Sequence, residues 1–263
     1  MLLDLDGVFY IGDAPLPGGA DVVAWLDQQH IPYRFLTNTT SRPRAAIVDK
    51  LRGMGIATTE DQLLTPVVVA RDLLRRRGMR HPALFVPDAT AAELADLEPL
   101  PEGSETGAGA VVVGDLGQRW DFATLNRAFR LLMAEGDPPL VALGTTGYWR
   151  APDGLRLDAG AFVAALEYAT GRQAHVLGKP DAAFYSTAVA ALGDGVDEVV
   201  MVGDDVRVDV QGAQAAGLTG VLVRTGKFTP ADLDGKITPD GVLDSIADLP
   251  SWWQGTAADV RRP

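Results

Sequence analysis

The amino-acid sequence predicts an α/β fold in which a doubly wound parallel sheet carries a second, inserted α/β domain. Three observations lead to this prediction. Short apolar runs alternate with segments of helical periodicity, the pattern of βαβ units whose sheet is buried on both faces. The alternation occurs at both ends of the chain and again in its middle. The chain's 263 residues are enough for a core and one insertion.

The apolar pattern predicts most elements of the two end regions. In the first, we expect strands at 2–5 and 33–36 and helices at 19–29 and 42–54, the second helix starting with Ser41 and Pro43. Near the other end, the expected helices are 181–192 and 208–216, and the expected strands are 199–202 and 220–223. Residues 251–263 are expected to be a tail that docks the rings of Trp252 and Trp253.

The middle of the chain has its own alternation and is predicted to be a separate domain. The expected strands are 83–86, 110–113 and 140–143, and the expected helices are 122–135 and 159–170. The basic run 75–77 before it is interpreted as a solvated helix end, since cations stabilise a helix C-terminus. We therefore assign residues 1–78 and 174–263 to the core and residues 79–173 to an inserted α/β cap.

Composition excludes several classes of function. A net charge of −12 and a pI near 4.6 argue against a nucleic-acid partner, and no apolar run reaches the roughly 18 residues of a membrane span. Without cysteine, the chain has no disulfide, thiolate metal site or thiol nucleophile. The start lacks the pattern of a signal peptide, so a cytoplasmic location is expected. With 4 lysines among 23 basic residues and abundant alanine, the composition indicates a GC-rich bacterial genome.

Four polar clusters follow expected strands in sequence order: DLDG at 4–7, TNTTS at 37–41, GKP at 178–180 and GDDVRVD at 203–209. Each cluster alone is explained as a turn or a helix cap. Together they are better explained as one site, because the carboxyl ends of parallel strands form the crevice where ligands bind.

The residue types in these clusters suit a phosphoryl group held beside Mg²⁺. Carboxylates form the all-oxygen donor set that Mg²⁺ prefers, and they would repel one another without a cation. Lys179 adds a fixed positive charge, and Thr37 and Asn38 offer hydrogen-bond donors for phosphoryl oxygens. The carboxylates concerned belong to Asp4, Asp6, Asp204, Asp205 and Asp209.

These clusters resemble the four motifs of the haloacid dehalogenase-like hydrolases, which implies a Rossmann-like core. The insertion between the second and third motifs is similar to the cap of subfamily IIA, which includes the N-acetylglucosamine-phosphate and 4-nitrophenyl phosphatases. Longer segments, among them VLGKPDAAFY and VRTGKF, resemble one group of phosphatases in that subfamily.

The resemblance implies two catalytic carboxylates. Asp4 is expected to be the nucleophile that forms an aspartyl phosphate. Asp6 is expected to act as general acid toward the leaving group and then as general base toward water, which requires a raised pKa.

The resemblance also implies the surrounding roles. Mg²⁺ would be held by Asp4, the main-chain carbonyl of Asp6, and Asp204, while Asp205 and Asp209 would orient waters or Lys179. Thr37 and Asn38 would bind the phosphoryl group, and Lys179 would neutralise Asp4 and the transition state. Within the cap, the loop at 144–150, with Tyr148, is expected to contact the rest of the substrate.

The function predicted is therefore a Mg²⁺-dependent phosphatase acting on a small phosphorylated compound: a phosphate ester, pyrophosphate or phosphoramidate. Two alternatives stay open at this point: a phosphomutase of the same superfamily and a catalytically idle binding protein of the same fold. The resemblance further implies a homodimer formed through the cap.

Overall fold

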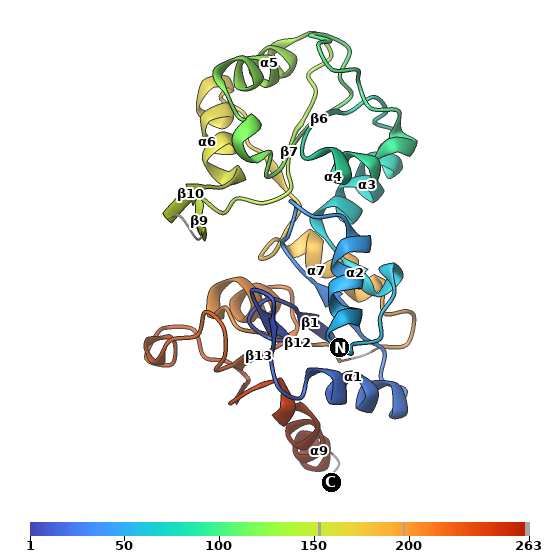
Figure 1. Ribbon diagram of the computed structural model, residues 1–263, viewed down its shortest axis with the longest axis vertical. Coiled ribbons are helices and arrows are strands. Elements are labelled where there is room, and N and C mark those ends of the chain that lie inside the picture. Colours follow the sequence, from blue (N-terminus) through green and yellow to red (C-terminus); the bar gives the residue numbers. More distant parts are fainter. Residues whose placement is uncertain (152–153, 197, 261–263) are drawn as a thin grey trace. The chain divides into compact units, whose positions relative to one another are not determined.

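The computed structural model describes residues 1–151, 154–196 and 198–260. The chain forms two compact units, drawn in Figure 1. The first unit comprises Met1–Thr37, Arg44–Leu64 and Lys179–Pro263, and the second comprises Asn38–Pro43 and Thr65–Gly178. The sequence-derived boundaries at 79 and 173 fall inside the second unit.

The first unit is built on a six-stranded parallel sheet with the order β14-β13-β12-β1-β4-β5. β1 lies inside the sheet, where Leu2 pairs with Met201 of β12 and with Arg34 of β4. The end regions of the sequence therefore share one sheet, as predicted. Its strands are β1 (Leu2–Asp4), β4 (Arg34–Leu36), β5 (Leu63–Leu64), β12 (Val200–Gly203), β13 (Thr219–Val223) and β14 (Gly241–Leu243).

Helices cover both faces of this sheet, which confirms the doubly wound α/β class. Side chains from α1, α2 and α9 share a core with Leu3 and Val202, whereas Leu222 packs with Val206 and Val210 of the π-helical segment η4. The helical segments are α1 (Gly19–Gln28), α2 (Arg44–Gly53), α7 (Ala182–Ala190), η4 (Val206–Gln211), α8 (Gly212–Ala215) and α9 (Leu249–Val260). A short hairpin, β2 (Tyr10–Ile11) with β3 (Ala14–Pro15), follows β1.

The second unit has its own four-stranded parallel sheet, with the order β11-β8-β7-β6. Leu131 of α5 and Val163 of α6 pack against Val111 and Leu140 in its core. Its elements are α3 (Pro66–Arg76), β6 (Ala83–Phe85), α4 (Asp88–Ala92), β7 (Val111–Val113), α5 (Phe122–Met133), β8 (Leu140–Ala142), β9 (Tyr148–Ala151), β10 (Gly154–Leu157), α6 (Ala159–Thr170) and β11 (His175–Val176). Within the described part of the chain, no helix is long and apolar enough to cross a membrane.

Three local predictions need correction. α2 begins at Arg44, after Ser41 and Pro43, because a proline disfavours helical backbone at the residue before it. The loop predicted at 144–150 ends in strand β9 (Tyr148–Ala151), which forms an antiparallel hairpin with β10. Residues 251–260 of the expected C-terminal tail belong to helix α9, and residues 261–263 lie outside the described part of the chain; Trp252 and Trp253 do pack against the core as predicted.

Candidate active site

Lys179 lies between two buried carboxylates. Its Nζ donates hydrogen bonds to Asp4 Oδ1 and to Asp209 Oδ1, each at 2.6 Å. Burial acts to lower the pKa of Lys179, but the carboxylates of Asp209 and Asp4 outweigh it and the pKa is raised. Lys179 is therefore a permanent cation, fixed against one oxygen of Asp4.

The sheet brings these residues together from distant parts of the sequence. Asp4 ends β1 and pairs in register with Leu36, so Thr37 follows at the end of the neighbouring strand. Asp204 comes directly after β12 on the other side of β1. Asp209 lies in η4, which begins where the side chain of Asp205 caps the free backbone N–H groups of Arg207 and Val208.

Asp204 uses its two oxygens differently. Oδ2 accepts a hydrogen bond from the backbone N–H of Lys227 at 2.7 Å. Oδ1 is buried and has no hydrogen-bond partner among the residues described. Burial, together with the charge of Asp4, raises the pKa of Asp204 to about 7. Asp204 therefore keeps one buried acceptor whose bonding capacity is unused among the residues described.

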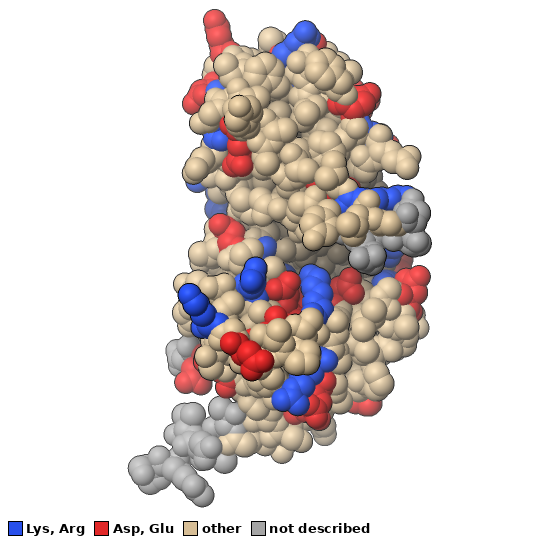
Figure 2. Space-filling model, turned by 90° about the vertical axis from the view of Figure 1, so that its left-hand side faces the viewer, with Lys and Arg blue, Asp and Glu red and all other residues tan. Residues whose placement is uncertain are grey.

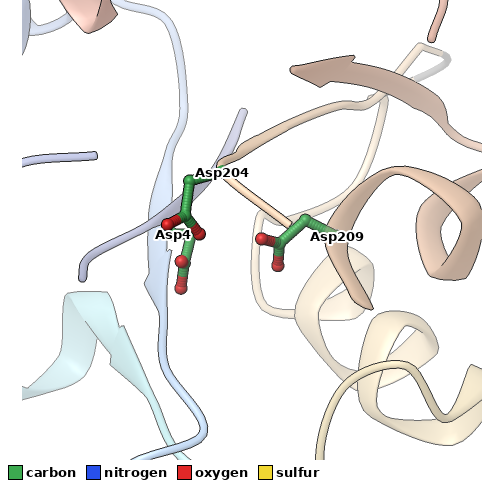
Figure 3. Close-up of side chains that lie close together, drawn as sticks. All are labelled: Asp4, Asp204 and Asp209. Atoms are coloured by element: carbon green, nitrogen blue, oxygen red, sulfur yellow. The ribbon is translucent and has the colours of Figure 1, made fainter. Parts of the chain in front are cut away.

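The three carboxylates fit a divalent cation. One oxygen each from Asp4, Asp204 and Asp209 lies within 4.8 Å of the others, and all three residues are buried (Figure 3). Oxygen donors with net negative charge suit Mg²⁺, and a cation would satisfy Oδ1 of Asp204. Both oxygens of Asp209 already accept hydrogen bonds, Oδ1 from Lys179 and Oδ2 from the backbone N–H of Asp205, so Asp4 and Asp204 are the side chains best suited to hold the ion.

Asp6 differs from these carboxylates because its side chain is exposed. The loop that carries it is tight: the backbone N–H of Gly7 donates to the carbonyl of Tyr10 at 2.7 Å. Gly7 has a φ of +82°, and a Cβ built on it would lie 1.9 Å from Oδ2 of Asp204. Glycine is required here, since the loop backbone touches a site carboxylate.

The remaining predicted residues fall in both units. Thr37 is buried in the first unit, and Asn38 belongs to the second, where its Oδ1 lies 3.0 Å from the position of a Cβ added to Gly178. Tyr148, in β9 of the second unit, is 64% exposed. The carboxylate of Asp205 caps η4 and lies 3.6 Å from Nζ of Lys227.

Sequence reasoning missed one contributor to this site, the turn at 225–227 after β13. The hydroxyl of Thr225 donates to the carbonyl of Gly7 at 2.5 Å, and the N–H of Lys227 donates to Asp204. In the sequence, the segment VRTGKF contributes only to the family resemblance. A polar cluster after a fifth strand end, in a parallel sheet, was the available signal.

Comparisons with known proteins agree with this geometry. Residues 1–98 match the family of haloacid dehalogenase-like hydrolases, and residues 176–249 match the family described as HAD-hydrolase-like. Phospholysine phosphohistidine inorganic pyrophosphate phosphatase of Bos taurus is 36% identical over 253 residues, covering 94% of this chain and 91% of the relative. It belongs to the group of phosphatases that the longer segments indicated.

Two further proteins extend the comparison. Haloacid dehalogenase-like hydrolase domain-containing protein 2 of Bos taurus is 38% identical over 239 residues, covering 91% of this chain and 88% of the relative. The crystal structure of 4-nitrophenylphosphatase from Thermotoga maritima matches with a TM-score of 0.84 and 28% identity, covering 95% of each chain. With its fold and its buried carboxylates, the chain belongs to the haloacid dehalogenase-like hydrolases and is a phosphatase of subfamily IIA.

Proposed function

We propose that this phosphatase hydrolyses a small phosphorylated compound with Mg²⁺, through an aspartyl phosphate formed on Asp4. One observation carries the proposal: Lys179 fixes one oxygen of Asp4 at 2.6 Å, beside an oxygen of Asp204 that has no partner among the described residues. A nucleophile, a cation and an unfilled acceptor are the parts that phosphoryl transfer needs.

The proposed reaction has two steps. A carboxylate oxygen of Asp4 attacks phosphorus while the bond to the leaving group breaks, and Asp6 gives its proton to that group. Asp6 then takes a proton from water, whose oxygen attacks phosphorus and releases phosphate, restoring Asp4. Lys179 offsets the negative charge that gathers around the phosphoryl group in both steps.

Side chains and main chain share the binding of ligands in this proposal. Asp4, Asp204 and the carbonyl of Asp6 would hold Mg²⁺, which when bound supplies positive charge to the phosphoryl oxygens. Thr37 and Asn38 would donate to those oxygens. Asp209 keeps Lys179 in place through its 2.6 Å hydrogen bond.

Substrate class, assembly and location are extensions of the same proposal. The Bos taurus relative is named for phospholysine, phosphohistidine and inorganic pyrophosphate, which supports testing phosphoramidates and pyrophosphate as well as esters. Tyr148, exposed in the second unit, would contact the part of the substrate beyond its phosphate. We also propose a homodimer formed through the cap, which the family resemblance implies. The proposed cytoplasmic location rests on the sequence pattern at the start of the chain.

A substrate panel tests the function. Phosphate esters, pyrophosphate and phosphoramidates are incubated with enzyme and Mg²⁺, and free phosphate is measured, with a chelator as the matched control. We expect phosphate release that needs Mg²⁺, and a stoichiometric aspartyl phosphate in rapid-quench samples. Phosphate transfer to a second position of the substrate without release would instead indicate a mutase. Full activity in excess chelator would exclude the metal from the mechanism.

A further inference from the structure

The turn at 225–227 ties together the loops that follow two neighbouring strands. It comes after β13, and β12 and β1 lie next in the sheet. Its Thr225 hydroxyl bonds the carbonyl of Gly7, and its Lys227 N–H bonds Oδ2 of Asp204. One short turn therefore contacts both the loop that carries Asp6 and a carboxylate of the proposed metal site.

Two glycines permit this close approach. A Cβ built on Gly226 would lie 2.0 Å from Oδ2 of Asp204 and 2.5 Å from Cα of Gly7. A Cβ built on Gly7 would lie 1.9 Å from the same oxygen. Gly7 has a φ of +82° and Gly226 a φ of +65°, a backbone conformation that other residues adopt at a cost. The two backbones thus enclose one oxygen of Asp204.

The consequence is that the Asp204 carboxylate cannot rotate freely. Oδ2 is held by the N–H of Lys227 and enclosed by Gly7 and Gly226, so Oδ1 is the oxygen that remains available. A buried acceptor without a partner destabilises the folded chain, and a bound cation would remove that cost. The turn contacts Oδ2, and Oδ1 is left for a cation.

We propose that the turn at 225–227 is a positioning element for Mg²⁺, and that the Thr225 hydroxyl, through Gly7, is its key contact. Thr225 holds the Gly7 carbonyl, which keeps the Asp6–Gly7 loop against Asp204 and so keeps Oδ1 of Asp204 aimed at the ion. The inference rests on the proposed Mg²⁺ dependence. Groups that orient metal ligands contribute about 10–100-fold to metal affinity.

The test compares three threonine variants of the whole chain without substrate. Thr225→Val removes the hydroxyl and keeps the shape, and Thr225→Ser keeps the hydroxyl. Thr229→Val is the matched control, because the Thr229 hydroxyl also donates a hydrogen bond, to the carboxylate of Asp232 at 3.0 Å, outside the site. Mg²⁺ affinity is measured by calorimetry, and the metal-free melting temperature of each variant is recorded.

We expect Thr225→Val to weaken Mg²⁺ binding by about tenfold, with Thr225→Ser and Thr229→Val staying close to wild type. In assays, Thr225→Val should need more Mg²⁺ for half-maximal activity and should recover most of kcat at saturating Mg²⁺. A merely structural turn would lower the melting temperature without changing this Mg²⁺ requirement.

Unchanged Mg²⁺ affinity in Thr225→Val, or equal weakening in Thr229→Val, would overturn the inference. If Thr225→Val does not fold, Thr225→Ala removes the same hydroxyl without adding a methyl group and is judged by the same result. Failure of the wild-type chain to bind Mg²⁺ would overturn the proposed metal role together with this inference. Wild-type binding with an unaffected valine variant would overturn the inference alone.

Discussion

Lys179 sets the geometry of the proposed nucleophile at the scale of single residues. It bonds one oxygen of Asp4 and one of Asp209 while all three side chains are buried. Replacing one partner would leave a buried charge without its counter-ion, which is costly. The contact between Lys179 and Asp4 is therefore best tested by a substitution that keeps the shape and hydrogen bonding of the side chain.

Asp4→Asn is such a substitution. We expect kcat to fall by about 10⁴-fold or more, because an amide oxygen cannot attack phosphorus as a carboxylate does. The fall in kcat is measured as phosphate release under saturating Mg²⁺. Asp13→Asn is the matched control, since Asp13 is exposed in the same segment, and it should behave as wild type. Activity of Asp4→Asn within about tenfold of wild type would refute a covalent role for Asp4.

Asp6→Asn tests proton transfer. The loss of kcat/KM is expected to be smallest for leaving groups that depart without a proton, because a general acid contributes least to them. A series of aryl phosphates with leaving groups of different pKa gives the measurement. An equal loss along the whole series would count against Asp6 as the acid.

At the scale of loops and strands, Gly7 and Gly12 form a matched pair. Both have positive φ, +82° and +57°, but a Cβ on Gly12 meets nothing within 4 Å, whereas one on Gly7 meets Asp204. Alanine at either position should cost about 1 kcal/mol of backbone strain. Only Gly7→Ala should also weaken Mg²⁺ binding, measured by calorimetry. Similar Mg²⁺ affinities in both variants would show that the loop adapts.

The loop at 144–150, which runs into strand β9 of the hairpin β9–β10, is the element predicted to select the substrate. Tyr148→Ala should lower kcat/KM about tenfold for the best substrate and leave a small generic phosphate ester nearly unchanged. Tyr168→Ala is the control, because Tyr168 in α6 is 93% exposed in the same unit. Equal changes for both substrates would mean that the hairpin does not discriminate between them.

The elements also show how far the sequence could be interpreted. Strands such as β7 and helices such as α6 were predictable because apolar periodicity dominates when an element is buried on a regular face. The basic run at 75–77, interpreted as a helix end, does lie at the end of α3, whereas the start of α3 was not predicted although Thr65 caps it and Pro66 occupies its first turn. Two-residue strands such as β5 carry too little periodicity to detect.

The candidate site also has a part that the sequence could predict and a part that it could not. Asp4, Lys179, Asp204 and Asp209 were predictable because carboxyl ends of parallel strands converge. The different surroundings of the two Asp204 oxygens depend on the position of the Lys227 N–H group and on the conformations of Gly7 and Gly226. Those are tertiary properties that sequence spacing does not encode, which explains why the turn at 225–227 escaped prediction.

At the scale of the whole molecule, charge and metal linkage can be tested together. Acidic and basic side chains are interspersed on the face drawn in Figure 2, while the grouped acidic oxygens of the site lie in the first unit. A ligand at 100 times its Kd stabilises the state that binds it by about 2.7 kcal/mol. Mg²⁺ should therefore suppress only those local unfolding events that disrupt the metal site.

We therefore expect Mg²⁺ to slow amide hydrogen exchange in peptides covering β1, β12 and the turn at 225–227. Peptides covering α5 and α6 in the second unit should exchange at the same rate with Mg²⁺ or with chelator. Asp204→Asn serves as the control, and its exchange should respond little to Mg²⁺. Equal slowing in α5 would show that both units open in a single cooperative step.

The position of β1 between β4 and β12 has a consequence for synthesis of the chain. β1 is made long before its partner β12 (Val200–Gly203), because most of the sequence shown lies between them. Until then one backbone edge of β1 has no native partner, and unpaired edges are prone to aggregation. Ribosome-bound chains that stop before β12 should accordingly depend on chaperones, whereas chains that extend past β14 can close the sheet.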